Sequence, residues 1–326
     1  MDIDEISKSE IVGVTSVASV GNISKLKQEL LMFDRLTFSD DSFLSAFLRG
    51  KGMAYNANEL EWLLEEGLIF KYVPKLNKRL ERDSKYKQYL RLIGAIDEQI
   101  DKSFKESELS SRRLDLPGTD ISIPRITLPK HIGQFRDEIF CRLKAYQLQR
   151  LESLQAYPLF YESAYTNKVS IPRKTKVIQI SLGFLPKPDE STPWEKILDY
   201  RADPDSKGKF FALRNWMNEI ARSDIDPREI EEKLEWLIYD YQRHLDLHRL
   251  KSTMGNFETI VVTTADILEN LTKMRWGKLA QSFFSIRKRK IALLEAELTS
   301  PGAEVAYIVK TQGSFEGQKP ADRMSN

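Results

Sequence analysis

The stretch from Thr192 to Lys251 carries one helix-start pattern three times, as Thr192-Pro193-Trp194-Glu195, Asp203-Pro204-Asp205-Ser206 and Asp226-Pro227-Arg228-Glu229. In each segment a small side chain with an oxygen atom can accept hydrogen bonds from the first backbone N–H groups of a helix. Proline follows at the first helical position, where its missing N–H group costs nothing. The first and third segments add a glutamate three residues after the cap, which completes a capping box. Three consecutive helices are therefore predicted, with caps at Thr192, Asp203 and Asp226.

The composition is that of an ordered protein rich in helix-forming residues, because 41% of the 326 residues are apolar and 30% are charged. The length fits two domains of about 100 to 200 residues each. The 50 basic and 48 acidic side chains nearly cancel, so the formal charge of +2 predicts no particular partner. Affinity for nucleic acid or anionic lipid would have to come from local clusters of charge.

Cysteine use and the N-terminal residues both favour the cytosol. A single cysteine, Cys141, excludes an internal disulfide framework and fits a reducing compartment. Its helical surroundings predict an inert thiol, packed or half-exposed, rather than a nucleophile. Residues 1–10 are acidic and polar, unlike a signal peptide, and no apolar run approaches the ~18 residues of a membrane span. We therefore expect a cytoplasmic protein without a membrane span.

Two short strands flank a helix near the N-terminus. Ile11 to Val17 alternates β-branched with small residues, Arg35 to Phe38 is a second candidate strand, and a helix is predicted from Ser24 to Phe33. The turn after the first strand lacks the glycine spacing of a phosphate-binding loop, so we predict no nucleotide site. From Pro74 to Tyr89, lysine and arginine alternate with tyrosine, a pattern that can bind nucleic acid. Because acids interrupt this pattern and leucines supply a core face, we prefer a solvated helix surface.

A loss of periodicity between Ser103 and Gly118 predicts a domain boundary, and a long helix is predicted after it, from His131 to Gln155. We expect a mixed helical domain at 11–108, an α+β domain at 119–310 and a disordered tail at 311–326. Alternating apolar residues predict further strands at Val177–Leu185, Phe257–Thr263 and Val305–Lys310. The predicted class is α+β, predominantly helical, with a small sheet and long capped helices in the C-terminal half.

Two histidines lie one turn apart at the end of the third capped helix, in the segment Arg243-His244-Leu245-Asp246-Leu247-His248. The spacing suits metal ligands, but the glutamate of the HExxH zinc motif is absent, so we predict no metal and no cofactor. The segment also resembles the short signature of the HEPN ribonucleases, helical proteins in which an arginine and a histidine act on the RNA phosphate. The resemblance implies that Arg243 stabilises charge on the phosphate while His248 moves the 2′-hydroxyl proton. We prefer to interpret both histidines as core or helix-end residues.

The second candidate site is a basic segment between Leu271 and Leu294, which contains no acidic residue. Its basic side chains are Lys273, Arg275, Lys278, Arg287, Lys288, Arg289 and Lys290. One interpretation is a basic surface that binds RNA, DNA or an acidic protein. The preferred one is that this segment packs against the acidic helix that begins after Asp226, so that the two balance each other's charge.

The sequence contains no nucleophile, paired-carboxylate or phosphate-loop pattern that defines an enzyme. We therefore predict a cytosolic protein that binds another macromolecule, either a protein partner or a second copy of itself. The alternatives are a metal-independent ribonuclease centred on Arg243 and His248, and a nucleic-acid-binding protein that uses the basic segment.

Overall fold

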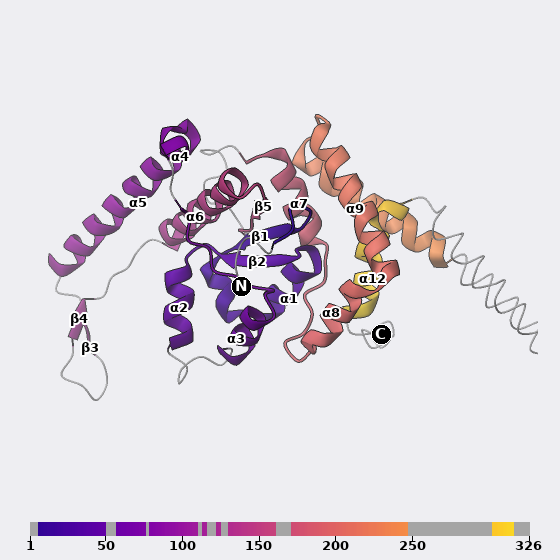
Figure 1. Cartoon of the computed structure of the whole chain (residues 1–326), viewed down its shortest axis with the longest axis horizontal. Helices are drawn as coiled ribbons and strands as arrows, with labels where there is room; N and C mark the ends of the chain where they lie inside the picture. The colour runs from indigo at the N-terminus through magenta and orange to yellow at the C-terminus, as the bar shows by residue number, and fades with distance from the viewer. Residues whose placement is uncertain are drawn as a thin grey trace, which may run out of the picture. The chain divides into compact units, whose positions relative to one another are not determined.

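The structure, a computed structural model, describes residues 6–49, 57–75, 78–109, 113–115, 122–124, 130–160, 171–246 and 302–315. Within these ranges the chain is predominantly helical with a small parallel sheet, which confirms the predicted α+β class (Figure 1). The chain divides into two compact units. The first is formed by Met1–Thr175 with Lys187–Ile197, and the second by Lys176–Pro186 with Leu198–Asn326.

The first unit is built on three parallel strands in the order β2-β1-β5. β1 (Ile11–Thr15) and β2 (Arg35–Phe38) form where the sequence predicts strands. β5 (Gln155–Pro158) was not predicted, because it is short and ends in Pro158, a residue that sheets tolerate at an edge strand. Every residue of β1 is buried, as expected for a central strand covered on both faces.

Two helices position this sheet. α1 (Ile23–Met32) connects β1 to β2 and is capped by Asn22, whose side chain accepts a hydrogen bond of 2.9 Å from the Lys25 backbone N–H. A short 3-10 helix, η2 (Val17–Gly21), precedes it. α6 (Lys130–Leu151), close to the predicted range, packs against β1 and β5 (Figure 1).

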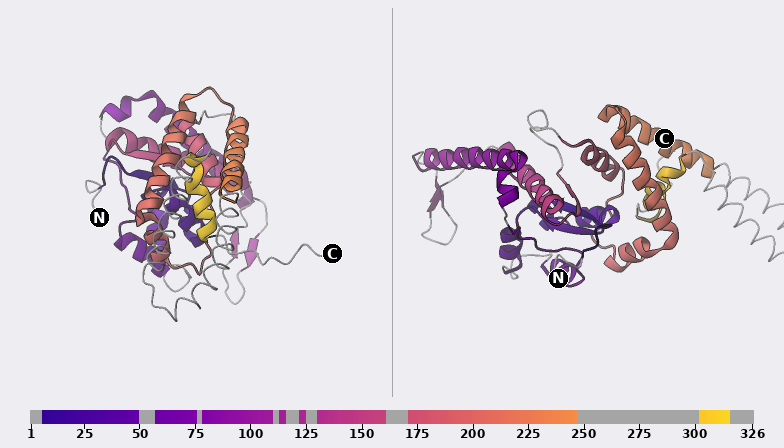
Figure 2. Two further views of the ribbon diagram at one scale, coloured as in Figure 1. Left: turned by 90° about the vertical axis from the view of Figure 1, so that its right-hand side faces the viewer. Right: turned by 45° about the horizontal axis from the view of Figure 1, so that its top comes forward.

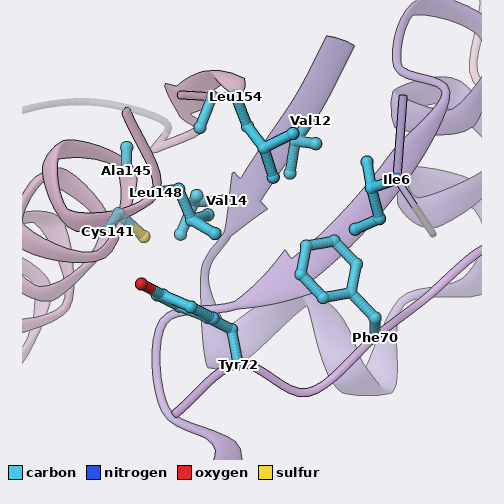
Figure 3. Packing of buried hydrophobic residues seen from close by; sticks show 10 residues of the cluster. Ile6, Val12, Val14, Phe70, Tyr72, Cys141, Ala145, Leu148 and Leu154 are labelled. Atoms are coloured by element: carbon cyan, nitrogen blue, oxygen red, sulfur yellow. The ribbon is translucent and has the colours of Figure 1, made fainter. Parts of the chain in front are cut away.

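A core cluster lies between α6 and the sheet (Figure 3). Val12 and Val14 point to the same face because alternate residues of a strand do so. The other members of the cluster are Ile6, Phe70, Tyr72, Cys141, Ala145, Leu148, Leu154 and Ala156. Cys141 is fully buried, and burial raises the pKa of its thiol well above the usual value. The thiol is therefore packed and unreactive, as predicted.

The remaining helices of the first unit are α2 (Asp41–Arg49), α3 (Ala57–Glu65), α4 (Lys78–Arg82) and α5 (Ser84–Leu109). α5 packs against α6 (Figure 1). The two helices share a second core cluster that includes Tyr86, Tyr89 and Tyr146. Asp83 caps α5, because its Oδ1 accepts hydrogen bonds from the backbone N–H groups of Lys85 at 2.9 Å and Tyr86 at 3.0 Å. A small hairpin follows, with β3 (Arg113–Asp115) antiparallel to β4 (Ser122–Pro124).

The first unit extends beyond the boundary expected between Ser103 and Gly118. That stretch itself is described only in part. Downstream of it, β5 pairs with β1, with Gln155 beside Ile11, and α6 packs on both strands. The sheet therefore takes its third strand from a part of the sequence that local periodicity does not connect with the first two.

The second unit contains α9 (Pro204–Arg222), a helix at 227–246, a 3-10 turn η3 (Ala303–Val305) and α12 (Ala306–Phe315). It also includes most of α7 (Arg173–Gly183) and α8 (Trp194–Ala202). α12, drawn in yellow, runs beside α9 (Figure 2). α8 begins close to the start predicted after Thr192.

The predicted caps at Asp203 and Asp226 are confirmed. Asp203 accepts a hydrogen bond of 2.9 Å from the Ser206 backbone N–H at the start of α9, where proline occupies the first turn. Asp226 accepts a bond of 2.9 Å from the Arg228 backbone N–H. The Asp226 backbone N–H donates to Glu229 Oε2 at 3.3 Å, which completes the capping box.

Replacing Asp226 by alanine is expected to cost about 0.5 to 2 kcal/mol of stability, because a backbone N–H loses its acceptor and the helix start loses a favourable negative charge. The shift of the urea midpoint of the second unit measures this cost. Glu231→Ala, an exposed substitution further along the same helix, is the control and should change the midpoint little. An equal midpoint for Asp226→Ala and wild type would contradict the cap.

Of the three strands predicted in the C-terminal half, Val177–Leu185 and Val305–Lys310 are wrong. The segment Val177–Leu185 lies in α7 and the turn after it, and its buried side chains include Val177, Ile178, Ser181, Leu182 and Leu185. These positions repeat with a helical period, whereas the alternation of Ile178, Ile180 and Leu182 that suggested a strand does not match the burial. The third predicted strand, Phe257–Thr263, lies outside the described residues.

The segment predicted as a strand at Val305–Lys310 forms η3 and the start of α12. Tyr307, Thr311 and Phe315 succeed one another on one helix face and all contact Tyr200. The ring centroids of Tyr307 and Phe315 lie 5.8 and 5.2 Å from that of Tyr200, and its hydroxyl lies 2.8 Å from Thr311 Oγ1. Residues 311–315 of the expected disordered tail are thus helical, and the rest of the tail lies outside the described residues.

A charged cluster holds α12 to the start of α9. Lys310 Nζ donates to Asp203 Oδ2 at 2.8 Å and to Asp205 Oδ2 at 2.6 Å. The hydrogen bond from Lys310, together with those from Ser206, holds the pKa of Asp203 well below its usual value. The cap of α9 is therefore also an attachment point for the last described helix.

Candidate functional site

Open parallel sheets bind ligands at the carboxyl ends of their strands, beside the strand where the order reverses. In the first unit this place is the end of β1, between β2 and β5. Polar and charged side chains gather there from β1, α1, α2 and α6. Most of them are buried, so the contacts of each side chain decide whether the cluster binds a ligand or only supports the fold.

Lys144 of α6 occupies the end of β2. Its Nζ donates to the Phe38 carbonyl oxygen at 2.7 Å and to Asp41 Oδ2 at 2.7 Å. Asp41 Oδ2 also accepts a bond of 2.9 Å from the Tyr72 backbone N–H. Burial lowers the pKa of Lys144, and the carboxylate of Asp41 opposes this change. The lysine thus ties three segments together, and its charge is balanced within the fold.

A second buried pair lies within α1, where Lys25 Nζ is 3.5 Å from Glu29 Oε1. Thr15, the last residue of β1, also donates to Glu29 Oε1 at 3.0 Å. Burial raises the pKa of Glu29 and lowers that of Lys25. Both changes oppose the charged forms, as expected for two ionisable groups removed from water.

α6 adds two further connections at this end of the sheet. Asp137 Oδ1 accepts a hydrogen bond of 2.5 Å from the Ser39 hydroxyl. Arg142 forms a buried ion pair with Glu138 one turn away, and its guanidinium lies 5.0 Å from the centroid of the Phe160 ring. Each of these charged side chains has a partner of opposite charge or a hydroxyl donor, although Glu29 Oε2 and Asp41 Oδ1 accept no hydrogen bond from the described residues. The ion pairs and hydrogen bonds of the cluster support the sheet.

A pocket of about 360 Å³ lies between α4 and the end of α6, lined in part by Arg79, Asp83, Arg150 and Ser153. Arg79 and Asp83 of its lining belong to the basic and aromatic region between Pro74 and Tyr89. Tyr146 of α6, beside this region, already contacts two cations, because Lys85 Nζ and the Arg150 guanidinium lie 5.3 and 5.5 Å from the centroid of its ring.

Tyr86 and Tyr89 of this region, together with Tyr146 of α6, are buried in the cluster between α5 and α6. A nucleic acid base needs an exposed ring to stack on. The burial of these rings therefore favours a solvated helix surface, which is the preferred interpretation of this region, over a surface that binds nucleic acid.

The second unit carries a different kind of surface on the helix 227–246. Trp236 and Tyr239 are 59% and 63% exposed, which is unusual for large aromatic side chains. With 100° per residue, Glu232, Trp236, Tyr239 and Arg243 fall within about 60° of one another. All four are exposed. We call these four residues the aromatic face.

The aromatic face lies opposite the core side of its helix. The buried side chains of the helix are Ile230, Leu234, Leu237, Ile238 and Tyr241. Their mean direction is about 170° away from that of the aromatic face, at 100° per residue. The two aromatic rings therefore point into solvent and contribute little to the core.

Sequence reasoning found the core stripe of this helix and Arg243, but it missed Trp236 and Tyr239. The sequence does indicate them, because these two large aromatic residues lie on the polar side of an otherwise regular amphipathic helix. Arg243 is exposed and His244 is partly exposed. His248 and all seven residues of the basic segment lie outside the described residues, so the structure does not bring the proposed ribonuclease pair together or place the basic surface.

Comparison of the chain with known protein families, with curated proteins and with solved structures finds no match. Among the described residues, no three or more histidine, cysteine or acidic side chains gather closely enough to hold a metal ion. No helix in the described ranges is long and apolar enough to cross a membrane.

Proposed function

We propose that this protein binds another protein through the aromatic face and has no catalytic activity of its own. The exposure of Trp236 and Tyr239 carries the proposal. Trp, Tyr and Arg are the residue types that dominate binding energy at protein interfaces, and the aromatic face contains one of each. An exposed pair of this kind on the solvent pole of a helix has no evident role in folding.

The charge around the aromatic face favours a protein over a nucleic acid. The helix 227–246 holds six acidic residues against three basic ones, counted as Glu229, Glu231, Glu232, Glu235, Asp240 and Asp246 against Arg228, Lys233 and Arg243. Exposed aromatic rings can stack on bases, but a nucleic acid also needs positive charge to neutralise its phosphates. The acidic surroundings would repel the phosphate backbone.

A cytosolic location is part of the proposal. It is supported by the free and buried Cys141, the single cysteine of the sequence, because the fold needs no oxidising compartment.

Site-specific photocrosslinking tests this function. A photoreactive phenylalanine analogue at position 239, in cells of the native host, is expected to give protein crosslinks that survive nuclease treatment. The additional change Trp236→Ala should abolish them. The matched control is Phe211→Ala, which removes an aromatic side chain that is 56% exposed on α9 of the same unit. Crosslinks that disappear with nuclease would contradict a protein partner.

The ribonuclease alternative is tested on the same protein. Purified wild type is expected to leave single-stranded RNA intact without added metal. Cleavage that disappears in both Arg243→Ala and His248→Ala, with unchanged circular dichroism spectra, would overturn the proposal in favour of the enzyme.

A further inference from the structure

We infer that the protein bound by the aromatic face is a second copy of this chain, paired antiparallel about a two-fold axis through the helix 227–246. The inference rests on the proposed function and names its partner. It comes from the order of the residues along the face, which reads acid, Trp, Tyr, base in Glu232, Trp236, Tyr239 and Arg243.

A two-fold axis makes an interface self-complementary, so that one residue contacts a second and the second contacts the first. With the axis midway between Trp236 and Tyr239, Trp236 of one copy lies opposite the partner's Tyr239. The same axis brings Glu232 opposite the partner's Arg243. Two aromatic pairs then form the centre and an ion pair closes each side.

A further pair of opposite charges falls into the same register near the ends of the helix. Arg228 and Asp246 share one side of the aromatic face and lie almost equally far from the axis. Antiparallel pairing therefore brings Arg228 close to the partner's Asp246. Together these contacts span about 27 Å of helix at 1.5 Å per residue.

Parallel pairing of the same two helices is disfavoured by the same charges. In that arrangement each side chain meets its own copy, so Glu232 opposes the partner's Glu232 and Arg243 the partner's Arg243. Like charges placed opposite each other cost several kcal/mol and exclude the wrong arrangement. The charge pattern thus selects both the partner and its direction.

The aromatic face has the composition of an interface centre with a polar rim. Tyr and Trp supply a large contact area at a low cost in side-chain entropy, and the surrounding charges exclude water. One helix per copy gives a smaller contact than the roughly 1,600 Å² of a standard interface. We therefore expect a dimer that dissociates in the micromolar range.

Sedimentation equilibrium of the full chain tests the inference. Wild type is expected to form dimers as the concentration rises through the micromolar range. Glu232→Arg and Arg243→Glu should each weaken dimerisation at least about tenfold, because each variant faces like charges at both ends of the pair. Glu231→Arg, an exposed charge reversal outside the aromatic face, is the control and should dimerise as wild type does.

Mixing the two charge-reversal variants provides the decisive measurement. A heterodimer of Glu232→Arg with Arg243→Glu restores an opposite-charge pair on both sides, so the mixture should dimerise although neither variant does alone. Trp236→Ala with Tyr239→Ala should remain monomeric in every mixture. Circular dichroism and thermal unfolding of each variant verify that it is folded.

The outcomes separate this inference from the proposed function. A wild-type protein that stays monomeric at all concentrations, or a mixture that fails to recover dimers, overturns the inference. If the crosslinks at position 239 then join this chain to a different protein, the proposed function stands with another partner. If crosslinks to protein are absent as well, both are wrong.

Discussion

Replacing Lys144 by methionine is expected to lower the stability of the first unit by about 3 to 5 kcal/mol, the usual cost of removing one partner of a buried ion pair. The methionine fills a similar volume but donates no hydrogen bond. The Tyr72 backbone N–H is then the remaining hydrogen-bond donor to Asp41, because its Oδ1 has no partner among the described residues. The Phe38 carbonyl oxygen at the end of β2 also loses its contact with Lys144 Nζ.

Hydrogen exchange of the β1 and β2 amides measures this loss, since both strands belong to the first unit. Lys87→Met is the matched control, because this lysine is exposed on α5 and its replacement should change stability by no more than about 0.5 kcal/mol. Adding Asp41→Asn to Lys144→Met removes the uncompensated charge and should recover part of the loss. Equal protection in Lys144→Met and wild type would show that the ion pair does not hold the sheet.

Gly302→Ala is the second substitution with a large expected effect. Gly302 precedes η3 with a φ of +78°, in the left-handed region that L side chains rarely adopt. An added Cβ would lie 2.6 Å from the Leu237 carbonyl oxygen and 3.2 Å from Tyr241 Cβ. The left-handed backbone costs about 1 to 2 kcal/mol and the crowding about 1 to 3 kcal/mol more.

The loss should appear as faster hydrogen exchange in α12 and in the helix 227–246, because Gly302 lies at their contact. Gly208→Ala is the control in the same unit. Gly208 lies inside α9 with open space around its Cα, so alanine should stabilise that helix by about 1 kcal/mol. Two glycine-to-alanine changes are thus expected to act in opposite directions. A stabilising effect of Gly302→Ala would contradict the strained turn.

The sequence predicted best what depends on local chemistry. Asp203 and Asp226 cap helices because their carboxylates meet N–H groups two or three residues away, and this needs no distant contact. β1 and β2 were also predicted, and all residues of β1 and three of the four residues of β2 are buried. β5 was missed because its pairing with β1 is determined by tertiary structure.

The prediction of a strand at Val305–Lys310 was wrong because tertiary contacts determine the structure of this segment too. Its apolar residues alternate over a few positions, and a short run fits a strand and a helix equally well. The contacts of Tyr307, Thr311 and Phe315 with Tyr200 select the helix. The aromatic face was missed although its signal is local, because an amphipathic helix is recognised from its buried stripe and not from the residues on the opposite side.

The position of β5 late in the sequence of the first unit also determines when this unit can complete its folding. β1 and β2 are synthesised well before β5, because the strand that pairs with the other edge of β1 ends at Pro158. At a synthesis rate of about 5 to 20 residues per second, that edge waits on the order of ten seconds for its partner. During this interval the central strand of the sheet exposes unpaired N–H and C=O groups, which is the condition under which nascent chains associate incorrectly. The most buried strand of the finished unit is therefore the one most in need of protection at the ribosome.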